Sequence, residues 1–464
     1  MSAKLHILDL ANRTASTPIH TAGRADDGLR PLPNYLKEPK NLTTKHSRTA
    51  LISASRNLYK NNGIVKGAID MKAEYAVGKA FSYKSLADNP DHAALYTNFI
   101  HGFYKIATTT GHNFHSLLYT ISTALDVDGD AFILLTRTST GFPKLQFIRA
   151  NRISSPKNGI IATGPYKGLH CHDGIIYNKY ASEFAYWLDS DDPANSRIIP
   201  ASSLLHVADV DYLSTSRGEP LFAHALREFQ YLDDINSSEL GAMKIASQIA
   251  LIEKSETGTP DLSSLVTTPN PDGGINILST GDKQIRYLKS DASLDTLRFE
   301  RPSPNYLAYH TRLLHTILAG VGIPYDIVMT PDSNGVGNRV SLAKFDATVR
   351  DRTTLLEEIA HKLISYALAT AITRGDLPAT HNWHSMLFSK PKRPSVDLGR
   401  DSAAQLNEYN AGIKNLTDIC AENGIRLEDH LATRATEAAL AEKFRLQAET
   451  KHHVTIPPNL IRNI

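Results

Sequence analysis

A chain of 464 residues is too long for one ordinary hydrophobic core and predicts two to four structural units. Hydrophobic residues make up 41% and charged residues 21%, which excludes wholesale disorder, and a net charge of +2 gives no bulk sign of a nucleic-acid-binding protein. Two cysteines, Cys171 and Cys420, exclude a disulfide framework, and no apolar run approaches the about 18 residues of a membrane helix, so we expect assembly in the cytoplasm without a membrane partner.

The first 218 residues predict an extended N-terminal arm followed by a mixed unit of helices and strands. Residues 1–45 are rich in Pro, Asn, Thr and charge and offer little material for a core. From residue 46 the pattern favours two helices separated by a turn at 61–63, and a third helix over 94–118. A turn at 126–130 and a buried strand follow, with further short strands at 145–149, 170–188 and 203–210.

The middle of the chain predicts two helices that flank a small β-rich insertion. A breaker at 218–220 precedes a long helix over 219–256. Residues 257–303 are rich in Pro, Gly and Asp and contain the short strand patterns INILS and IRYLK, hardly enough to support a core alone. A second helix follows over 304–323.

A glycine-rich loop from Met329 to Arg339 leads into the longest predicted helix. No Gly or Pro interrupts residues 340–374, and Gly375 after Arg374 is a plausible stop. Residues at helical spacing predict one buried face: Phe345, Val349, Leu356, Ile359, Leu363, Tyr366 and Thr370. The remainder, 375–464, predicts a Pro-rich connection and three helices near 401–412, 417–423 and 428–450.

Two short patterns suggest ligand-binding sites, but each lacks residues that such a site requires. Asp126, Asp128 and Asp130 resemble the start of a calcium loop, but the sixth and twelfth positions hold Ala131 and Arg137, so a tight turn is the better interpretation. The Gly335-Val-Gly337 sequence has no Gly-Lys-Ser/Thr after it and no third glycine, which argues against a nucleotide site. We therefore expect no cofactor, no metal and no catalytic residues.

Five segments, in order, resemble the lambda-type phage portal proteins. They are SRNLYKNNGIVKGAIDMKAEYAVG, GDAFILL, RGEPLFAHALREFQYLDD, AGVGIPYDIVMTPDSNGVGNRVSLAKF and the segment that begins HNWHSMLFSKPKRPSVDLGR. Each is weak alone, and their order over about residues 45–450 carries the resemblance. The family loop usually reads Asn-Tyr-Ser-Ser-x-Arg, whereas this chain has NGVGNR, which leaves the contacts of the loop open.

The resemblance implies an α+β portal-protein fold. Its parts would be the N-terminal arm (1–45), an α/β wing (46–218), a first stem helix (219–256), a clip (257–303), a second stem helix (304–323), a tunnel loop with the long wing helix (324–374) and a helical crown (375–464). The chain would be one subunit of a ring, usually of twelve, at one vertex of the virion capsid. Its partners would be double-stranded DNA, the terminase large subunit, the major capsid protein and a head–tail connector or adaptor.

The resemblance also suggests residues that face DNA. In the tunnel loop these are Asn334, Gly335, Gly337, Asn338 and Arg339, and along the channel they are Lys289 and Arg312. Equally, Arg339 could cap or pair with the start of the helix. Two other functions stay open: another ring-forming head–tail connector component, and a DNA-processing enzyme, for which the sequence offers no acidic metal cluster.

Overall fold

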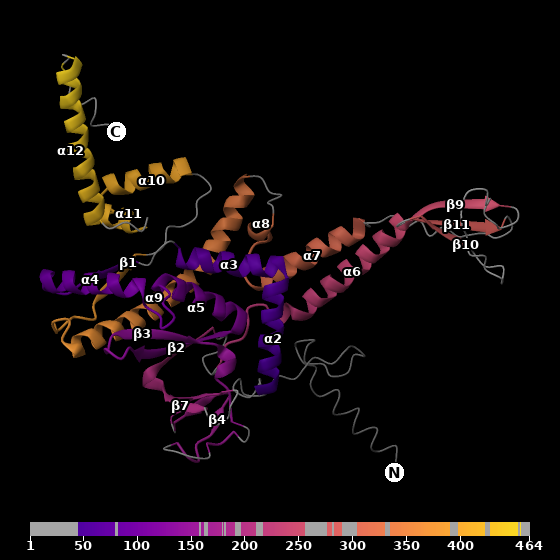
Figure 1. Cartoon of the computed structure of the whole chain (residues 1–464), viewed down its shortest axis with the longest axis horizontal. Helices are drawn as coiled ribbons and strands as arrows, with labels where there is room; N and C mark the ends of the chain where they lie inside the picture. Colours follow the sequence, from indigo (N-terminus) through magenta and orange to yellow (C-terminus); the bar gives the residue numbers. More distant parts are fainter. Residues whose placement is uncertain are drawn as a thin grey trace, which may run out of the picture.

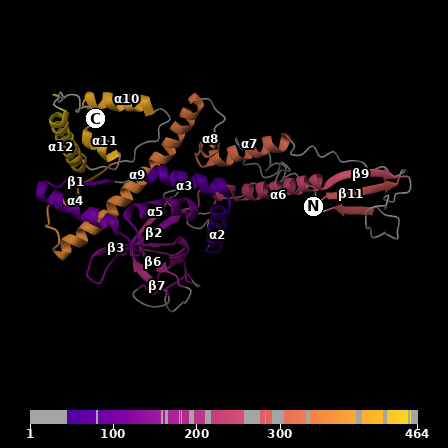
Figure 2. The same ribbon diagram turned by 45° about the horizontal axis from the view of Figure 1, so that its top comes forward.

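The computed structural model describes residues 45–78, 82–156, 159–161, 166–178, 180, 182–190, 196–209, 217–255, 276–280, 283–289, 304–329, 335–389, 398–422, 427–452 and 455. The chain forms three parts, seen in Figure 1: a body, a long projection that we call the stalk, and a group of C-terminal helices. The stalk extends from the same side of the body in Figure 2.

The body is a mixed assembly of helices and short strands. Its helices are α2 (Lys45–Asn61), α3 (Gly63–Val77), α4 (Pro90–Lys105), α5 (Phe114–Asp128), α8 (Tyr325–Val328) and α9 (Gly335–Arg374). Its strands are β1 (Ser82–Ser85), β2 (Asp130–Arg137), β3 (Pro143–Ile148), β4 (Cys171–His172), β5 (Ile175–Tyr177), β6 (Glu183–Leu188), β7 (Arg197–Pro200), β8 (Leu204–Ala208) and β12 (Met386–Ser389).

Helix α9 runs through the main hydrophobic core and confirms the predicted long helix. Its buried face includes Phe345, Val349, Leu356, Ile359 and Leu363, which pack in one cluster with residues of α3, α4 and α5. The helix ends at Gly375, with φ of +83°, where Gly375 N–H donates to Ile372 O and Asp376 N–H donates to Ala371 O, both at 3.0 Å. This pair of bonds is a Schellman cap, so the predicted stop is confirmed.

Two small antiparallel sheets complete the body. One has the order β3-β2-β8 and the other the order β4-β5-β6-β7. A second buried cluster, including Phe132, Ile148, Ile175, Tyr186 and Leu204, joins residues of both sheets. Strand β12 pairs antiparallel with β1, so the residues just after α9 return to the body and do not start a separate helical part there.

The stalk consists of two helices and a small sheet. Helices α6 (Leu226–Gln248) and α7 (Pro304–Gly320) run side by side from the body to strands β9 (Ile249–Ser255), β10 (Asn276–Thr280) and β11 (Lys283–Lys289) (Figures 1 and 2). The sheet order is β10-β11-β9, with β9 parallel to β11. Buried side chains lie at the body end of the stalk: Phe229, Leu232, Leu314, Ile317 and Leu318. Other large apolar side chains of the stalk are exposed: Tyr231 at the body end, and Leu240, Met243, Leu307 and Tyr309 farther along.

The C-terminal helices are α10 (Leu398–Asn410), α11 (Leu416–Glu422) and α12 (Leu427–His452), close to the three that were predicted. All three lie on one side of the body, away from the stalk tip (Figure 1). The predicted N-terminal arm lies outside the described residues, as do parts of the predicted insertion.

Three predicted boundaries were wrong. The helix expected over 94–118 is two helices, α4 and α5, and α5 continues to Asp128, so the acidic segment is a helix end and not a turn. Gly129 adopts the left-handed conformation that terminates α5, with φ of +85°. Helix α6 is shorter than predicted, because Ile249–Ser255 forms a strand that pairs with β11. Helix α9 begins at Gly335, five residues before the predicted start at Val340.

Candidate stalk–body junction

The stalk joins the body at two points, which we call the first root and the second root. The first root is the segment Arg217–Pro220, just before the 3-10 turn Ala223–Ala225 and α6. The second root is the segment Gly320–Ile323, where α7 ends. Both roots touch the body through side chains far away in the sequence, so they fix the direction of the stalk.

Arg217 anchors the first root and is fully buried. Its Nε donates to Asp130 Oδ2 at 2.6 Å, and its other guanidinium nitrogens donate to the carbonyls of Ala150, Ile153 and Asp173 at 2.8–3.2 Å. The guanidinium also lies 5.0 Å from the centre of the Phe132 ring. A buried charge with this many partners is costly to disturb, since removing either member of the pair leaves an uncompensated charge.

Asp130 is the shared acceptor at this root. Its Oδ1 accepts from the backbone N–H of Gly218 at 2.8 Å and lies 3.2 Å from His206 Nε2. Burial by itself would raise the pKa of Asp130, but the charge of Arg217 and the hydrogen bond from His206 outweigh it and hold that pKa well below its usual range. Asp130 is therefore a carboxylate that ties β2 to the start of the stalk.

Two glycines allow the backbone of the first root to approach β2 closely. A Cβ added to Gly218 would lie 2.0 Å from the Gly129 carbonyl oxygen, and one added to Gly129 would lie 2.6 Å from the Gly218 carbonyl oxygen. From the other side, Arg48 Nη1 of α2 donates to Gly218 O at 2.7 Å, and Arg48 Nε pairs with Asp173. The root is clamped between the end of α5 and the buried face of α2.

A second buried ionic cluster lies beside the first root and is centred on Asp126. Its Oδ1 accepts from Lys72 Nζ at 2.9 Å and from Arg352 Nη2 at 2.8 Å. Burial lowers the pKa of Lys72, and Asp126 offsets this only in part. The Asp126 carbonyl also accepts from the backbone N–H of Leu221 at 2.9 Å. Helices α3, α5 and α9 are thereby linked to the beginning of the stalk.

The second root is held by glycine geometry and by apolar packing. Gly322 has φ of +70°, and its N–H donates to Ala319 O while Ile323 N–H donates to Leu318 O, which forms another Schellman cap. Thr348 Oγ1 of α9 donates to Gly322 O at 2.9 Å. A Cβ on Gly320 would lie 2.7 Å from Nε2 of His224 in the first root's neighbouring turn. The second root therefore lies close to the turn that follows the first root.

The residues predicted to face DNA are not brought together at one described place. Gly335, Gly337, Asn338 and Arg339 lie in the first turns of α9 and not in a loop, and Asn334 lies outside the described residues. Ser341 Oγ in the next turn donates to Asp326 Oδ2 of α8 at 3.1 Å, which fixes the start of α9. Arg312 is exposed on α7, and Lys289 is the last residue of β11. Their contacts with DNA stay predictions.

The acidic segment that resembled a calcium loop has a structural role instead. Asp126 pairs with Lys72 and Arg352, Asp128 with Arg56, and Asp130 with Arg217. Within the described ranges, no three His, Cys, Asp or Glu side chains are grouped so that they could hold a metal ion. None of the described helices is both long enough and apolar enough to cross a membrane.

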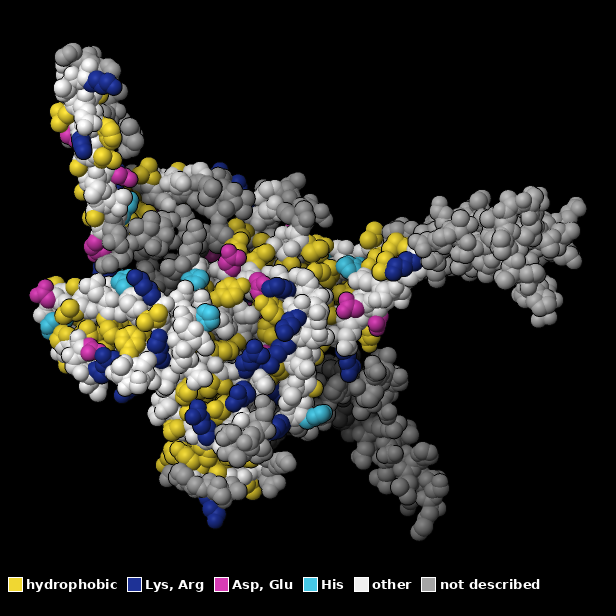
Figure 3. Space-filling view, viewed as in Figure 1, with side chains coloured by type: hydrophobic (Ala, Val, Ile, Leu, Met, Phe, Trp, Pro, Cys, Tyr) yellow, Lys and Arg dark blue, Asp and Glu magenta, His cyan; other side chains and the backbone are white. Residues whose placement is uncertain are grey.

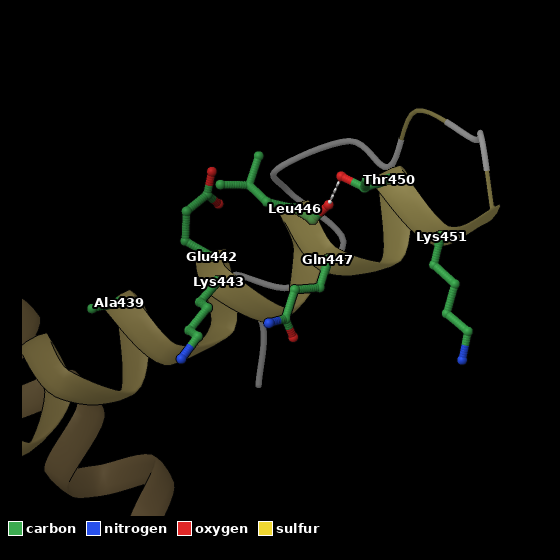
Figure 4. Close-up of a pocket in the computed structure, with 7 residues that line it drawn as sticks. All are labelled: Ala439, Glu442, Lys443, Leu446, Gln447, Thr450 and Lys451. Atoms are coloured by element: carbon green, nitrogen blue, oxygen red, sulfur yellow. Dashed lines mark hydrogen bonds between the residues drawn. The ribbon is translucent and has the colours of Figure 1, made fainter.

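Two hollows lie away from the junction. One, of about 470 Å³, lies between α2, α5 and β3 and includes Tyr59, Tyr119, Lys60 and Arg149 in its lining. Lys and Arg side chains gather over this part of the body in Figure 3, so the near-neutral chain has a locally basic face. The other follows α12 alone, and Figure 4 shows the side chains along it, from Ala439 to Lys451, with no second described element facing them.

Comparison with known proteins identifies the class. A model of the lambda family of phage portal proteins matches residues 34–350, which is more than half of the chain. The chain therefore belongs to the lambda family of phage portal proteins. Portal protein B of Escherichia phage lambda is 21% identical over 310 residues, and the match spans 58% of this chain and 58% of that protein.

Similar solved structures come from gene transfer agent particles. A chain in the virion of the native particle has a TM-score of 0.44 at 11% identity, covering 81% of this chain and 93% of its own length. A chain in the neck of the native particle, computed with C12 symmetry, has a TM-score of 0.43 at 10% identity, covering 83% and 95%. The family assignment rests on the sequence match alone.

Sequence reasoning missed the residues that build the junction. A signal was present on two helices, where a cation interrupts a buried apolar face: Lys72 between Ala68 and Ala76, and Arg352 between Val349 and Leu356. Such a residue needs a buried anion. The identity of that anion could not be found in this way, because Asp126 lies 226 residues away from Arg352.

Proposed function

We propose that this chain is one subunit of a ring-shaped portal at one capsid vertex, a conduit through which double-stranded DNA enters during packaging, is retained and later leaves. The observation that carries the proposal is the family match, which covers the whole stalk and the body as far as the first half of α9. We infer a structural role and not catalysis, with no cofactor. The alternatives, another connector component or a DNA-processing enzyme, have no comparable support.

The parts of the fold have natural roles in such a ring. The body would be the wing, α6 and α7 the stem, the β9–β11 sheet the clip, and the C-terminal helices the crown. The stalk exposes Tyr231, Leu307 and Tyr309 at 59%, 55% and 54%, respectively. A three-stranded sheet on two helices is too small to bury a core of its own, and neighbouring copies in a ring would cover these side chains.

The proposed partners follow from this position. A ring of twelve copies would contact the major capsid protein, dock the terminase large subunit during packaging and later receive the head–tail connector. Lys289, Arg312 and the first turn of α9 are the proposed DNA-facing positions. The low net charge of +2 suits a conduit, because many tight phosphate contacts would hold DNA in place.

The oligomeric state of the full-length protein tests the proposal. Mass photometry with negative-stain imaging should show rings with a central hole and a mass near twelve times 51.0 kDa. Leu307→Asp, on the stalk, should reduce the ring fraction, since it places a charge where copies meet. Leu95→Asp on α4, with a similar exposure of 49%, is the matched control and should leave rings intact. Monomers only, together with magnesium-dependent DNA cleavage, would refute the portal assignment.

A further inference from the structure

His206 of β8 is a buried titratable residue at the first root. Its presence there is not explained by a role in conducting DNA. Its side chain is 6% exposed and lies flat on Phe132, with ring centres 4.4 Å apart. Its Nδ1 is 3.0 Å from Glu183 Oε1 of β6, and its Nε2 is 3.2 Å from Asp130 Oδ1 of β2. Both ring nitrogens thus face carboxylate oxygens.

With Asp130 and Glu183 both ionised, this geometry fits one protonation state of His206. A neutral imidazole carries one N–H, so its other nitrogen would turn a lone pair toward a carboxylate. An imidazolium carries two N–H groups and can donate to both Asp130 and Glu183. The positions of the two acceptors therefore require the charged form of His206.

The charge balance of the surrounding cluster points the same way. The acidic members are Asp130, Asp173 and Glu183, and the permanent cations are Arg48 and Arg217. Among the described residues, Tyr186 also contacts this cluster and donates its hydroxyl to Glu183, and burial followed by the charge of Glu183 raises the pKa of this phenol, so it stays neutral. Among the described members of the cluster, two cations leave one of three carboxylates uncompensated, and a charged His206 supplies the missing positive charge.

The pKa directions of the three central groups agree with this assignment. Burial alone would lower the pKa of His206, but its hydrogen bonds to Asp130 and Glu183 raise it above the usual 6.5. Burial alone would raise the pKa of Glu183, yet the hydrogen bond and charge of His206 lower it. Glu183 is 37% exposed, so solvent can reach the edge of the cluster and exchange the proton.

We propose that the proton on His206 locks the first root of the stalk, so that its release loosens the segment that carries α6. Asp130 transmits the effect, because it accepts from His206, from Arg217 and from the backbone of Gly218 together. Loss of the proton leaves an excess negative charge beside this shared acceptor. The device is a property of the single chain and does not depend on assembly into a ring.

The pH window follows from the raised pKa. The stabilisation by His206 is complete below its unfolded value of about 6.5 and is lost as the pH rises through the higher folded value. Between these two values, the equilibrium constant for opening should increase up to about tenfold per pH unit, since one proton is released on opening.

Hydrogen exchange of the first root tests the proposal. Exchange of amides in residues 217–225 is measured by mass spectrometry between pH 6 and 9 and corrected for the intrinsic rate. The wild type should show the pH-dependent rise in opening, and so should the control His361→Gln, because His361 is exposed on α9. His206→Gln should open more readily at pH 6 and show no such rise.

Two results would overturn the proposal. One is a flat corrected profile in the wild type, which decides the matter even if His206→Gln fails to fold. The other is the same rise in folded His206→Gln as in the wild type, which would assign the proton to another group. Neither result bears on the portal function, which the ring experiment tests separately.

Discussion

Both roots attach the stalk to the body, but they do so with different interactions. The first root is ionic: Arg217, Asp130, Arg48 and Asp173 are all buried, and each supplies or receives bonds across long sequence distances. The second root has backbone caps and apolar packing, with a side-chain hydrogen bond from Thr348 to the carbonyl oxygen of Gly322. A buried ionic root is intolerant of the loss of one partner, whereas a packed root is most sensitive to added or misplaced volume.

Two different kinds of interaction therefore fix the direction of the stalk. Ionic and hydrogen-bonded groups at the first root demand specific geometry, since each donor must meet its acceptor. The apolar residues Val321 and Ile323 of the second root join the same core as α9. Phe229 and Leu232 of α6 belong to this core as well, so the stalk packs on the core through both of its helices, and buried charges tie it to the body at the first root in addition.

The largest expected effect is that of Arg217→Ala. Removal of the guanidinium leaves Asp130 buried beside unmatched carbonyls, and breaking a buried pair typically costs about 3–5 kcal/mol. Urea unfolding of the purified protein should show this loss. Arg350→Ala is the control, since the Arg350 side chain is 58% exposed and its pair with Asp346 should contribute less than about 1 kcal/mol. Equal effects of the two variants would contradict the ionic account of the first root.

A smaller effect is expected for Gly218→Ala. The new methyl group would meet the Gly129 carbonyl oxygen at 2.0 Å, and because that neighbour is backbone, the two backbone segments themselves must shift. Overpacking of this kind costs about 1–3 kcal/mol. Thermal unfolding measures the loss, and Gly241→Ala on α6, where a Cβ meets nothing within 4 Å, is the matched control. A Gly218→Ala protein as stable as that control would show that the close approach is not required.

The smallest effect is expected at the second root for Gly320→Ala. Its Cβ would meet the His224 ring at 2.7 Å, but this neighbour is a side chain that can rotate away. A helix-favouring alanine near the end of α7 also compensates in part, by up to about 1 kcal/mol. The unfolding midpoint should therefore change by less than for Gly218→Ala. A larger loss than at Gly218 would reverse the proposed contrast between the roots.

Local sequence patterns predicted the helices whose apolar spacing and end signals lie within the helix itself. The long helix α9 was expected because residues 340–374 lack Gly and Pro and place apolar residues at helical spacing, and Gly375 marked its end. Helix α7 and the three C-terminal helices were found in the same way. The start of α9 at Gly335 was missed because glycines at 335 and 337 suggest a loop.

Features set by distant partners were not predictable. Ile249–Ser255 continues the pattern of α6, and only pairing with β11 makes it a strand, although Ile249 and Ile252 carry the β-branched chains that favour one. The Asp126–Asp130 segment suggested a turn from its local Asp and Gly residues. Its structural role depends on cationic partners from α2, α3, α9 and the first root, which the local sequence does not reveal. The buried charge pairs of the junction are therefore the hardest feature to predict from a single sequence.

Whether the chain forms a portal ring can be decided by a cryo-electron-microscopy reconstruction of the assembled full-length protein. We expect a closed ring in which α6 and α7 of every copy surround the central channel, with exposed Arg312 near the channel and the β9–β11 sheet at one end of the ring. A closed ring whose stalks point away from the axis, or an assembly that does not close, would contradict it.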